Sequence, residues 1–333
     1  MRLDPARVYL DWATMARAEA ARGDGIDAVA IVTPNHLHHP VAAAFLDAGI
    51  HVICDKPLAT SVEQALDLVR RVRTSGLEFA LTHNYTGYPM VRQAREMVAA
   101  GELGTLRLIQ AEYIQDWLAE PLERTGQKQA DWRTDPARSG PSGCIGDIGT
   151  HAFNLAAFIG GLELEQVAAD LTTFVPGRRL EDNAHMMLRY ADGVRGMLWA
   201  SQVAVGHLNR LVVRLYGTRG ALEFRQEDPN VLHFARLGES PQLLRRGGAG
   251  LGAAAGAATR IPGGHPEGYL EAFAVLYREF ADRLWARIER REPPATLVPG
   301  VEDGARAMKF IQAALDSHSR GGAWVDATLS LEG

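Results

Sequence analysis

The first part of the chain alternates short apolar runs with amphipathic segments. The runs are rich in Val, Ile and Leu and have the length of buried strands, whereas the segments between them have the period of helices. Near-continuous apolar strands of this kind form parallel sheets that helices cover on both faces. The expected elements are a helix over 7–22, strands over 25–33, 51–57 and 77–85, and helices over 38–48, capped by Asn35, and over 60–75.

From residue 90 onward the pattern changes. A helix over 90–100 and a strand over 106–116 lead to a polar loop, and another helix begins near Asp147. Strands that alternate apolar and polar residues then follow through short turns, which predicts a mostly antiparallel sheet. The expected strands span 167–175, 183–190, 194–204, 209–218 and 220–226, and the expected closing helices span 267–291 and 301–319. The Gly/Ala-rich stretch 245–260 is expected to form a mobile surface loop or lid.

These patterns predict an α/β fold in two domains. Residues 1–88 are expected to form a Rossmann-like domain with a doubly wound parallel sheet. Residues 89–333 are expected to form an α+β domain with a large, mostly antiparallel sheet. The length of 333 residues suits two domains better than one core. Since an open sheet of this size is usually covered by a partner, we expect a homo-oligomer, either a dimer or a tetramer.

Composition excludes several classes of protein. Charged residues make up 23% of the chain and the formal net charge is -5, so nothing indicates a nucleic-acid partner. The longest apolar runs, such as 152–159, are too short to span a bilayer, and the N-terminus lacks the pattern of a signal peptide, so we expect a cytoplasmic location and no membrane partner. Cys54 and Cys144 lie in different segments and suit reduced thiols.

The three predicted strand ends of the first domain are polar. Ligands of doubly wound sheets bind at the carboxyl ends of strands, so these ends should line one crevice. Lys56 lies between a buried strand and Pro57, which suits a hydrogen bond to a substrate oxygen, and the alternative is a surface salt bridge to Asp55. The residues at the three ends are Thr33, Pro34 and Asn35, then Asp55 and Lys56, then His83, Asn84 and Tyr85.

The glycine loop of dinucleotide-binding domains is missing from the first domain. Such a loop has the pattern Gly-x-Gly-x-x-Gly and lies between a strand and a helix. A relaxed copy, Gly248-x-Gly250-x-x-Ala253, occurs in the Gly/Ala-rich stretch, where no strand precedes it. We therefore expect that residues 1–88 lack the first strand, the glycine loop and the second strand, and that this chain binds a cofactor weakly.

Asp147 and His151 are candidates for acid–base chemistry. They are four residues apart in a predicted helix, so the carboxylate and the imidazole lie on one face and can act on one substrate group. The alternative is that Asp147 caps the helix and His151 is a hydrogen-bonded core residue. A metal site that adds His36, His38 and His39 is disfavoured because adjacent residues point in different directions, and we expect no metal.

Taken together and in order, these residues resemble the glucose-fructose oxidoreductase, inositol dehydrogenase and rhizopine-catabolism (Gfo/Idh/MocA) family. The resemblance covers the chain from about residue 7 onward. The sugar and polyol dehydrogenases of the family, such as levoglucosan and inositol dehydrogenases, are the most similar branch. The matching motifs are Thr33-Pro34-Asn35-x-x-His38, Asp55-Lys56-Pro57, Asn84-Tyr85, Trp132-Arg133 and Gly146-Asp147-x-x-x-His151.

The resemblance implies an NAD(P)-dependent dehydrogenase that oxidises a CH–OH group of a sugar, sugar derivative or polyol by hydride transfer, with NAD or NADP as cofactor. It also implies that residues 1–88 are an incomplete NAD(P)-binding domain and that residues 89–333 serve substrate binding and oligomerisation. It implies that Lys56 holds the reacting hydroxyl and lowers its pKa, that His151 takes its proton, and that Asp147 orients the substrate or His151. The residues implied to bind the cofactor are Thr33, Pro34, Asn35, His38, Asp55, Lys56, Asn84, Trp132 and Arg133. Those implied to contact the substrate are Tyr113, Gln115, Trp117 and His265.

The chain departs from the family pattern at two of these motifs. Asp55 stands where the family usually has Glu, and Thr86-Gly87 stands where an Arg-aromatic pair is common. Two other functions stay open. One is a sugar-binding, dimerising protein without catalysis, and the other is an NAD-dependent enzyme that cleaves glycosidic bonds through a transient ketone.

Overall fold

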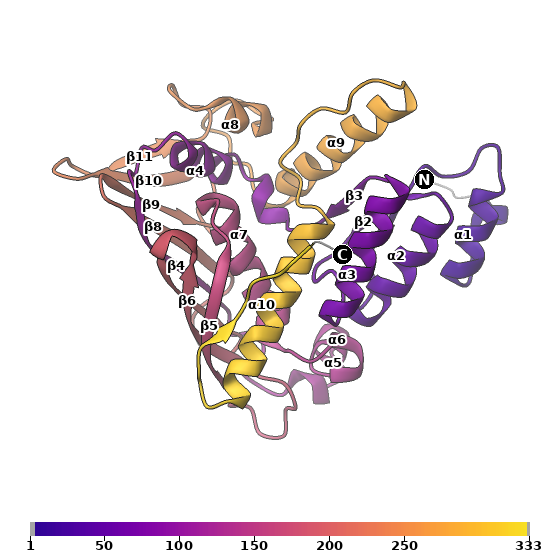
Figure 1. Ribbon diagram of the computed structural model, residues 1–333, viewed down its shortest axis with the longest axis horizontal. Helices are drawn as coiled ribbons and strands as arrows, with labels where there is room; N and C mark the ends of the chain where they lie inside the picture. Colours follow the sequence, from indigo (N-terminus) through magenta and orange to yellow (C-terminus); the bar gives the residue numbers. More distant parts are fainter. Residues whose placement is uncertain (1–3, 332–333) are drawn as a thin grey trace.

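The protein folds around two β-sheets, one small and one large, and the computed structural model describes residues 4–331 (Figure 1). The strands are β1 Ala28–Ile31, β2 His51–Cys54, β3 Phe79–Leu81, β4 Leu106–Ile114, β5 Leu164–Thr172, β6 Asn183–Tyr190, β7 Arg195–Ser201, β8 Arg210–Gly217, β9 Gly220–Arg225, β10 Val231–Arg236, β11 Gln242–Arg245 and β12 Val325–Asp326. The α-helices are α1 Trp12–Ala20, α2 His38–Asp47, α3 Val62–Ser75, α4 Pro89–Ala99, α5 Lys128–Arg133, α6 Pro136–Ser139, α7 Thr150–Gly160, α8 Ala253–Ala258, α9 Tyr269–Ile288 and α10 Val301–Ser319.

The small sheet is parallel, with the strand order β1-β2-β3. Helix α2 packs on β1 and β2, and α3 packs on α2. Helix α3 has the ends that its sequence predicts. The Ser61 hydroxyl accepts a hydrogen bond from Gln64 N at the start of α3, and Gly76 ends the helix in the left-handed conformation. On the other side of the sheet, Phe280 of α9 packs on Ile53 and Ala80.

The large sheet has the order β11-β10-β9-β8-β4-β7-β6-β5-β12. Its strands pair antiparallel except β4 and β7, which are parallel. Helices α4, α7 and α10 pack on one face, while Leu108, Met187 and Met197 are exposed. Helix α10 contacts both β5 and α3 and thereby joins the two sheets (Figure 1). The predicted fold class, a parallel Rossmann-like sheet followed by a large, mostly antiparallel one, is confirmed.

Several predicted elements differ from the structure. The helix expected over 7–22 is a short turn, Pro5–Arg7, followed by α1, which Asp11 caps. Asn35 does not cap α2, because its side-chain amide donates instead to the Ser139 carbonyl at 2.9 Å. The sequence pattern also missed the strands β10, β11 and β12.

The Gly/Ala-rich stretch 245–260 is partly ordered, which corrects the prediction of a mobile loop. Its centre forms α8, in which Ala255 and Ala258 are buried against α4. Backbone amides before and within α8 donate to the side chains of Gln93 and Glu96. These contacts come from a distant segment, so composition alone did not reveal them.

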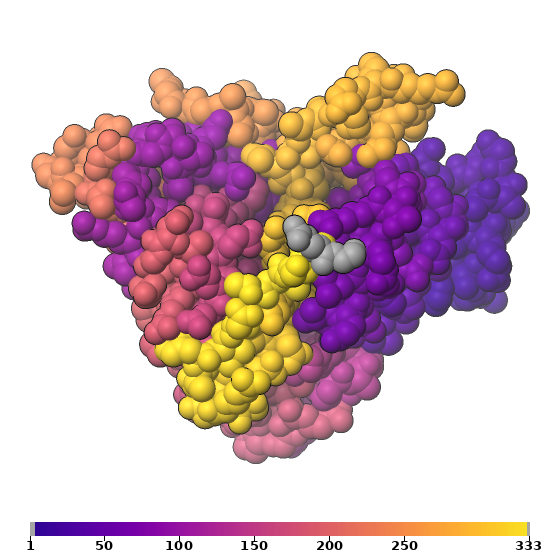
Figure 2. All heavy atoms as spheres, viewed as in Figure 1, coloured from indigo at the N-terminus to yellow at the C-terminus, as the bar shows by residue number. Residues whose placement is uncertain are grey.

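Figure 2 shows α9 projecting from the body of the molecule. Both cysteines, Cys54 and Cys144, are buried and free, as predicted. Across residues 4–331, each helix is too short or too polar to cross a membrane.

Candidate active site

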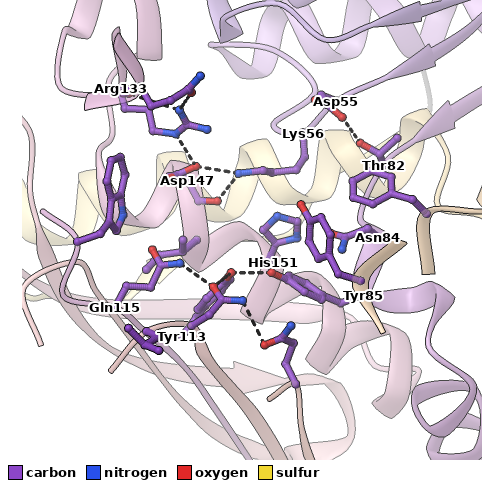
Figure 3. Close-up of a pocket in the computed structure, with 18 of the residues that line it drawn as sticks. Asp55, Lys56, Thr82, Asn84, Tyr85, Tyr113, Gln115, Arg133, Asp147 and His151 are labelled. Carbon is purple, nitrogen blue, oxygen red and sulfur yellow. Dashed lines mark hydrogen bonds and ion pairs between the residues drawn. The ribbon is translucent and has the colours of Figure 1, made fainter. Parts of the chain in front are cut away.

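A cavity of about 740 Å³ lies at the carboxyl ends of β2, β3 and β4. Its lining combines the ends of the small sheet with residues from the large sheet, the segment before α7 and the start of α9 (Figure 3). Of the predicted site residues, the structure brings these to the cavity: Asp55, Lys56, Asn84, Tyr113, Gln115, Trp117, Arg133, Asp147 and His151.

Lys56 reaches from the end of β2 to Asp147. Its ammonium lies 3.0 Å from the Asp147 Oδ1 atom and also donates to the Asp147 carbonyl (Figure 3). The alternative of a surface salt bridge to Asp55 is wrong, because Asp55 instead accepts a hydrogen bond from the Thr82 hydroxyl. An ammonium has three N–H groups, so one is left for a ligand in the cavity.

Asp147 lies in a π-helical turn, Ile145–Gly149, that leads directly into α7. Such turns are frequent at functional sites because they displace a side chain from the helical repeat. Its carboxylate contacts Arg133 Nε at 3.4 Å and Gln202 Nε2 at 2.9 Å, so it does not cap the helix. Burial alone would raise the pKa of Asp147, but the charges of Lys56 and Arg133 outweigh it, and the pKa falls to about 2.

The start of this turn is held by a buried carboxylate, that of Glu181. One of its oxygens accepts from the Ser142 hydroxyl at 2.6 Å, from Gly143 N at 2.8 Å and from Ile145 N at 3.2 Å. Since Glu181 precedes β6, these bonds fix the π-helical turn, and with it Asp147, to the large sheet.

His151 is buried at the wall of the cavity, in the first turn of α7. Its ring lies edge-on to Tyr85, with 4.8 Å between ring centroids, and to His83, at 5.5 Å. No described residue hydrogen-bonds its Nδ1 atom, so it is not the satisfied core histidine of the alternative interpretation. Burial and the nearby charge of Lys56 hold the pKa of His151 well below its usual range, which keeps the imidazole neutral and able to accept a proton.

The end of the cavity near β4 is neutral and strongly hydrogen-bonded. Tyr113 and Gln115, both predicted, bind the side chain of Asn209, which the sequence did not single out. All three residues lie at strand ends of the large sheet. The lining residues that the prediction missed are Thr82, Gln127, Gln129, Ile148, Leu208, Asn209, Gln226, Tyr269 and Phe273.

Four predicted cofactor residues, Thr33, Pro34, Asn35 and His38, lie just after β1 and do not line the cavity. His38 is buried and its two ring nitrogens contact the Pro57 carbonyl at 2.6 Å and the Thr33 carbonyl at 2.9 Å. It therefore ties the ends of β1 and β2 together. The Thr33 hydroxyl and the Asn84 side-chain nitrogen are buried without a hydrogen-bond partner among residues 4–331, so both are available to a ligand.

Two further predicted residues, Trp132 and His265, do not line the cavity either. Trp132 stacks on Arg133, with the guanidinium carbon 4.2 Å from a ring centroid of Trp132. His265 is exposed, and its carbonyl accepts a hydrogen bond from Arg246. The structure therefore places His265 outside the group that surrounds Lys56.

The histidines at 36, 38 and 39 point to three different surroundings. His36 contacts the Arg138 carbonyl, His38 contacts two backbone carbonyls, and His39 pairs with Asp67 at 2.9 Å. In the part of the chain that the structure describes, no group of His, Cys, Asp and Glu is arranged to hold a metal ion.

Two family models match this chain. The model described as "Oxidoreductase family, NAD-binding Rossmann fold" matches residues 5–96. The model described as "GFO/IDH/MocA C-terminal domain" matches residues 91–223. The two matches meet near the start of α4, where the small sheet gives way to the large one.

Two similar solved structures cover nearly all of the chain, and a curated relative covers about two thirds of it. An oxidoreductase from Sinorhizobium meliloti is 50% identical, with a TM-score of 0.88 and coverage of 97% of this chain and 85% of that one. An inositol dehydrogenase homolog from Azotobacter vinelandii, solved with NAD+, is 34% identical, with a TM-score of 0.92 and coverage of 97% and 84%. A levoglucosan dehydrogenase from Pseudarthrobacter phenanthrenivorans is 31% identical over 67% of this chain and 60% of its own length.

Proposed function

Because the chain belongs to the Gfo/Idh/MocA oxidoreductase family, we propose that it oxidises a CH–OH group of a sugar, sugar derivative or polyol by hydride transfer. The cofactor is NAD or NADP, since the matching N-terminal model describes an NAD-binding Rossmann fold. The substrate class is the part of this proposal that goes beyond the family.

The observation that carries the proposal is the meeting of Lys56 and His151 at one cavity. Lys56 keeps one N–H for a ligand after its two bonds to Asp147. Burial and the charge of Lys56 hold the pKa of His151 well below its usual range, so the imidazole is neutral and can accept a proton from a hydroxyl. A cation and a base that meet at one hydroxyl are what the oxidation of an alcohol requires.

Each of the three residues has a distinct role in this proposal. Lys56 donates a hydrogen bond to the oxygen of the reacting hydroxyl and favours its deprotonation by its positive charge. His151 takes the hydroxyl proton as the general base. Asp147 holds the ammonium of Lys56 in place, because its carboxylate contacts Lys56, Arg133 and Gln202 rather than His151.

The strand ends of the small sheet fit a nicotinamide cofactor. We propose that Thr33 and Asn84 bind it through their unpartnered polar atoms, next to Pro34 and Asp55. Asn35 and His38, which are bonded to the backbone, shape this end of the sheet. The chemistry that the cofactor supplies when bound is the acceptance of a hydride at its nicotinamide ring.

The division into domains supports this assignment. All three strands of the small sheet lie within 1–88, and all nine strands of the large sheet lie within 89–333. We propose that the first segment holds the cofactor and the second the substrate. We also propose that the chain assembles through the large sheet into a homo-oligomer in the cytoplasm.

The test is an oxidation assay with a panel of polyols and sugars that includes myo-inositol, levoglucosan and D-xylose. NAD+ or NADP+ is supplied at millimolar concentration, and NADH or NADPH formation is followed. At least one compound should be oxidised to a ketone or lactone. Lys56→Ala should lower kcat by about 10² to 10³-fold, whereas Lys309→Ala, a matched change on α10 outside the cavity, should not. Binding of a panel compound without any reduction of NAD+ or NADP+ would instead favour the non-catalytic sugar-binding protein.

A further inference from the structure

A chain of hydrogen bonds runs along the wall of the cavity away from Lys56 (Figure 3). Asn209, just before β8, is at its centre. The Asn209 Oδ1 atom accepts from the Tyr113 hydroxyl at 2.6 Å and from Gln115 Nε2 at 2.7 Å. The Asn209 Nδ2 atom donates to Gln226 Oε1 at 3.1 Å. The amide of Asn209 is therefore oriented with its oxygen towards Tyr113.

This orientation decides the direction of the next bond in the chain. The hydroxyls of Tyr113 and Tyr85 lie 2.6 Å apart. A phenol has one proton, and that of Tyr113 is given to Asn209, so Tyr85 must be the donor to Tyr113. Burial raises the pKa of both phenols above their usual range, so both keep their protons at neutral pH. Tyr85 then has only its lone pairs to offer to a ligand.

The acceptor at Tyr85 lies beside the proposed base. The rings of Tyr85 and His151 have centroids 4.8 Å apart, and both residues line the cavity. A substrate whose reacting hydroxyl meets His151 therefore places its neighbouring substituent close to Tyr85. A hydroxyl can donate to Tyr85. A methoxy group, a carbonyl or a carboxylate has no proton to donate, so its lone pairs repel those of the Tyr85 oxygen.

The charges around this wall also favour a neutral substituent. The wall formed by Tyr85, Tyr113, Gln115 and Asn209 carries no charged side chain. The cations that line the cavity, Lys56 and Arg133, both contact the Asp147 carboxylate. An anionic substituent at this wall would lose its hydration without gaining a cation.

We propose that Asn209 is a positioning residue that fixes the proton direction of the Tyr85–Tyr113 pair, and that the site thereby selects neutral polyols or sugars with a hydroxyl beside the reacting carbon. This inference rests on the proposed function and narrows its substrate class. Uronic acids and derivatives that are deoxy or O-methylated at the neighbouring carbon are excluded.

The test compares the best substrate of the panel with its monodeoxy derivatives, its mono-O-methyl derivatives and its uronic or carboxylic acid analogue. The specificity constant kcat/KM is measured for each compound, and calorimetry measures the binding of the same compounds without cofactor. In the wild-type protein, one deoxy derivative and the O-methyl derivative at the same position should each lose about tenfold or more. The acid analogue should lose at least as much.

Variants separate the positioning role from a structural one. Asn209→Leu leaves the proton direction of the Tyr85–Tyr113 pair unfixed, so it should abolish most of the discrimination between the parent compound and its O-methyl derivative. Asn209→Asp keeps an acceptor for Tyr113 and Gln115 and should preserve it. Tyr113→Phe frees the proton of Tyr85 to point into the cavity, so the O-methyl derivative should improve by about tenfold relative to the parent. Asn183→Leu, a matched change at β6 outside the cavity lining, should leave the ratios unchanged.

The outcomes are distinct. The inference is overturned if both Asn209→Leu and Tyr113→Phe still discriminate the parent compound from its O-methyl derivative. Efficient use of the acid analogue by the wild-type protein also overturns it. Selective binding of the parent compound without reduction of NAD+ or NADP+ overturns the proposed dehydrogenase activity but supports the recognition that Asn209 sets. Because Asn209→Asp and Tyr113→Phe retain most of the packing, the inference stays testable even if Asn209→Leu does not fold.

Discussion

The ammonium of Lys56 lies 3.0 Å from the carboxylate of Asp147, although the two residues are 91 positions apart in the chain. Each side chain is 17% exposed, so the pair is largely removed from water. Lys56 comes from the end of the small sheet, and Asp147 comes from the π-helical turn that is bonded to the large sheet through Glu181. The ion pair therefore joins the proposed cofactor side of the cavity to its substrate side.

The first prediction concerns the stability that this pair provides. Asp147→Asn leaves the ammonium of Lys56 and the guanidinium of Arg133 without a counter-charge, which should lower the free energy of unfolding by about 3 kcal/mol. In the double variant with Lys56→Met the uncompensated ammonium is gone, so part of this loss should be recovered. Urea unfolding of the two single variants and the double variant measures the coupling. Strictly additive losses would show that the two side chains act independently.

The sequence predicted helices and strands best where one face is buried and the other is exposed to solvent. Helix α10 and strand β6 were placed at their observed bounds, because their apolar residues recur at helical and strand spacing respectively. Helix α1 begins later than predicted because Asp11 caps it, and α8 was missed because its stability comes from Gln93 and Glu96 of α4. Such tertiary contacts leave no local period in the sequence.

The residues of the candidate site were also predicted only in part. The rule that ligands bind at the ends of parallel strands placed Lys56 and Asn84 at the cavity. Asn209 and Gln226 were missed because each is a single amide at a strand end of an antiparallel sheet, where no rule marks a ligand site. Their importance depends on contact with Tyr113 and Tyr88, which lie 96 and 138 residues away in the chain, respectively.

The second prediction concerns the acid limb of the activity. His151 acts in the proposal as a base, so it is active when deprotonated. Burial and the charge of Lys56 hold its pKa well below 6.5. The value of kcat/KM should therefore stay level as the pH falls through 6.5 and decline only at lower pH. His151→Gln should lower kcat by about 10²-fold or more across the range. An acid limb centred at or above pH 6.5 in the wild-type protein would contradict this assignment.

The third prediction concerns stability in mild acid. Burial and then the charge of Lys56 lower the pKa of His83 to about 3, from 6.5 in the unfolded chain. Between these values the unfolded state binds a proton that the folded state does not, so stability is lost as the pH falls from 6.5 towards 3. One such histidine contributes a slope of about 1.4 kcal/mol per pH unit.

Replacing His83 should remove that contribution. Both ring nitrogens of His83 lack a hydrogen-bond partner among the described residues, so His83→Leu removes buried polar atoms rather than bonds. The slope of unfolding free energy between pH 4.5 and 6.5 should fall by about 1.4 kcal/mol per pH unit, as measured by urea unfolding at several pH values. Asp147, with its pKa of about 2, contributes only below this range. An unchanged slope would show that His83 is protonated or solvated in the folded protein.

The fourth prediction concerns the place where α9 meets the cavity. Gly87 stands where members of the Gfo/Idh/MocA family commonly have an aromatic residue. A Cβ atom at this position would lie 2.2 Å from the Ala272 carbonyl oxygen of α9. This close approach lets the start of α9 bring Tyr269 and Phe273 to the cavity, where Tyr269 lies 6.4 Å from the ring centroid of Tyr85.

Gly87→Ala should therefore push α9 away from the cavity. Since the contact is with backbone, relief requires a shift of the helix, which should cost about 1 to 3 kcal/mol of stability. With Tyr269 and Phe273 withdrawn, KM for the best panel substrate should rise by about tenfold. Gly256→Ala is the control, because that glycine lies in α8 with open space around it and should tolerate a methyl group. Equal KM values for Gly87→Ala and Gly256→Ala would show that the start of α9 does not contribute to substrate binding.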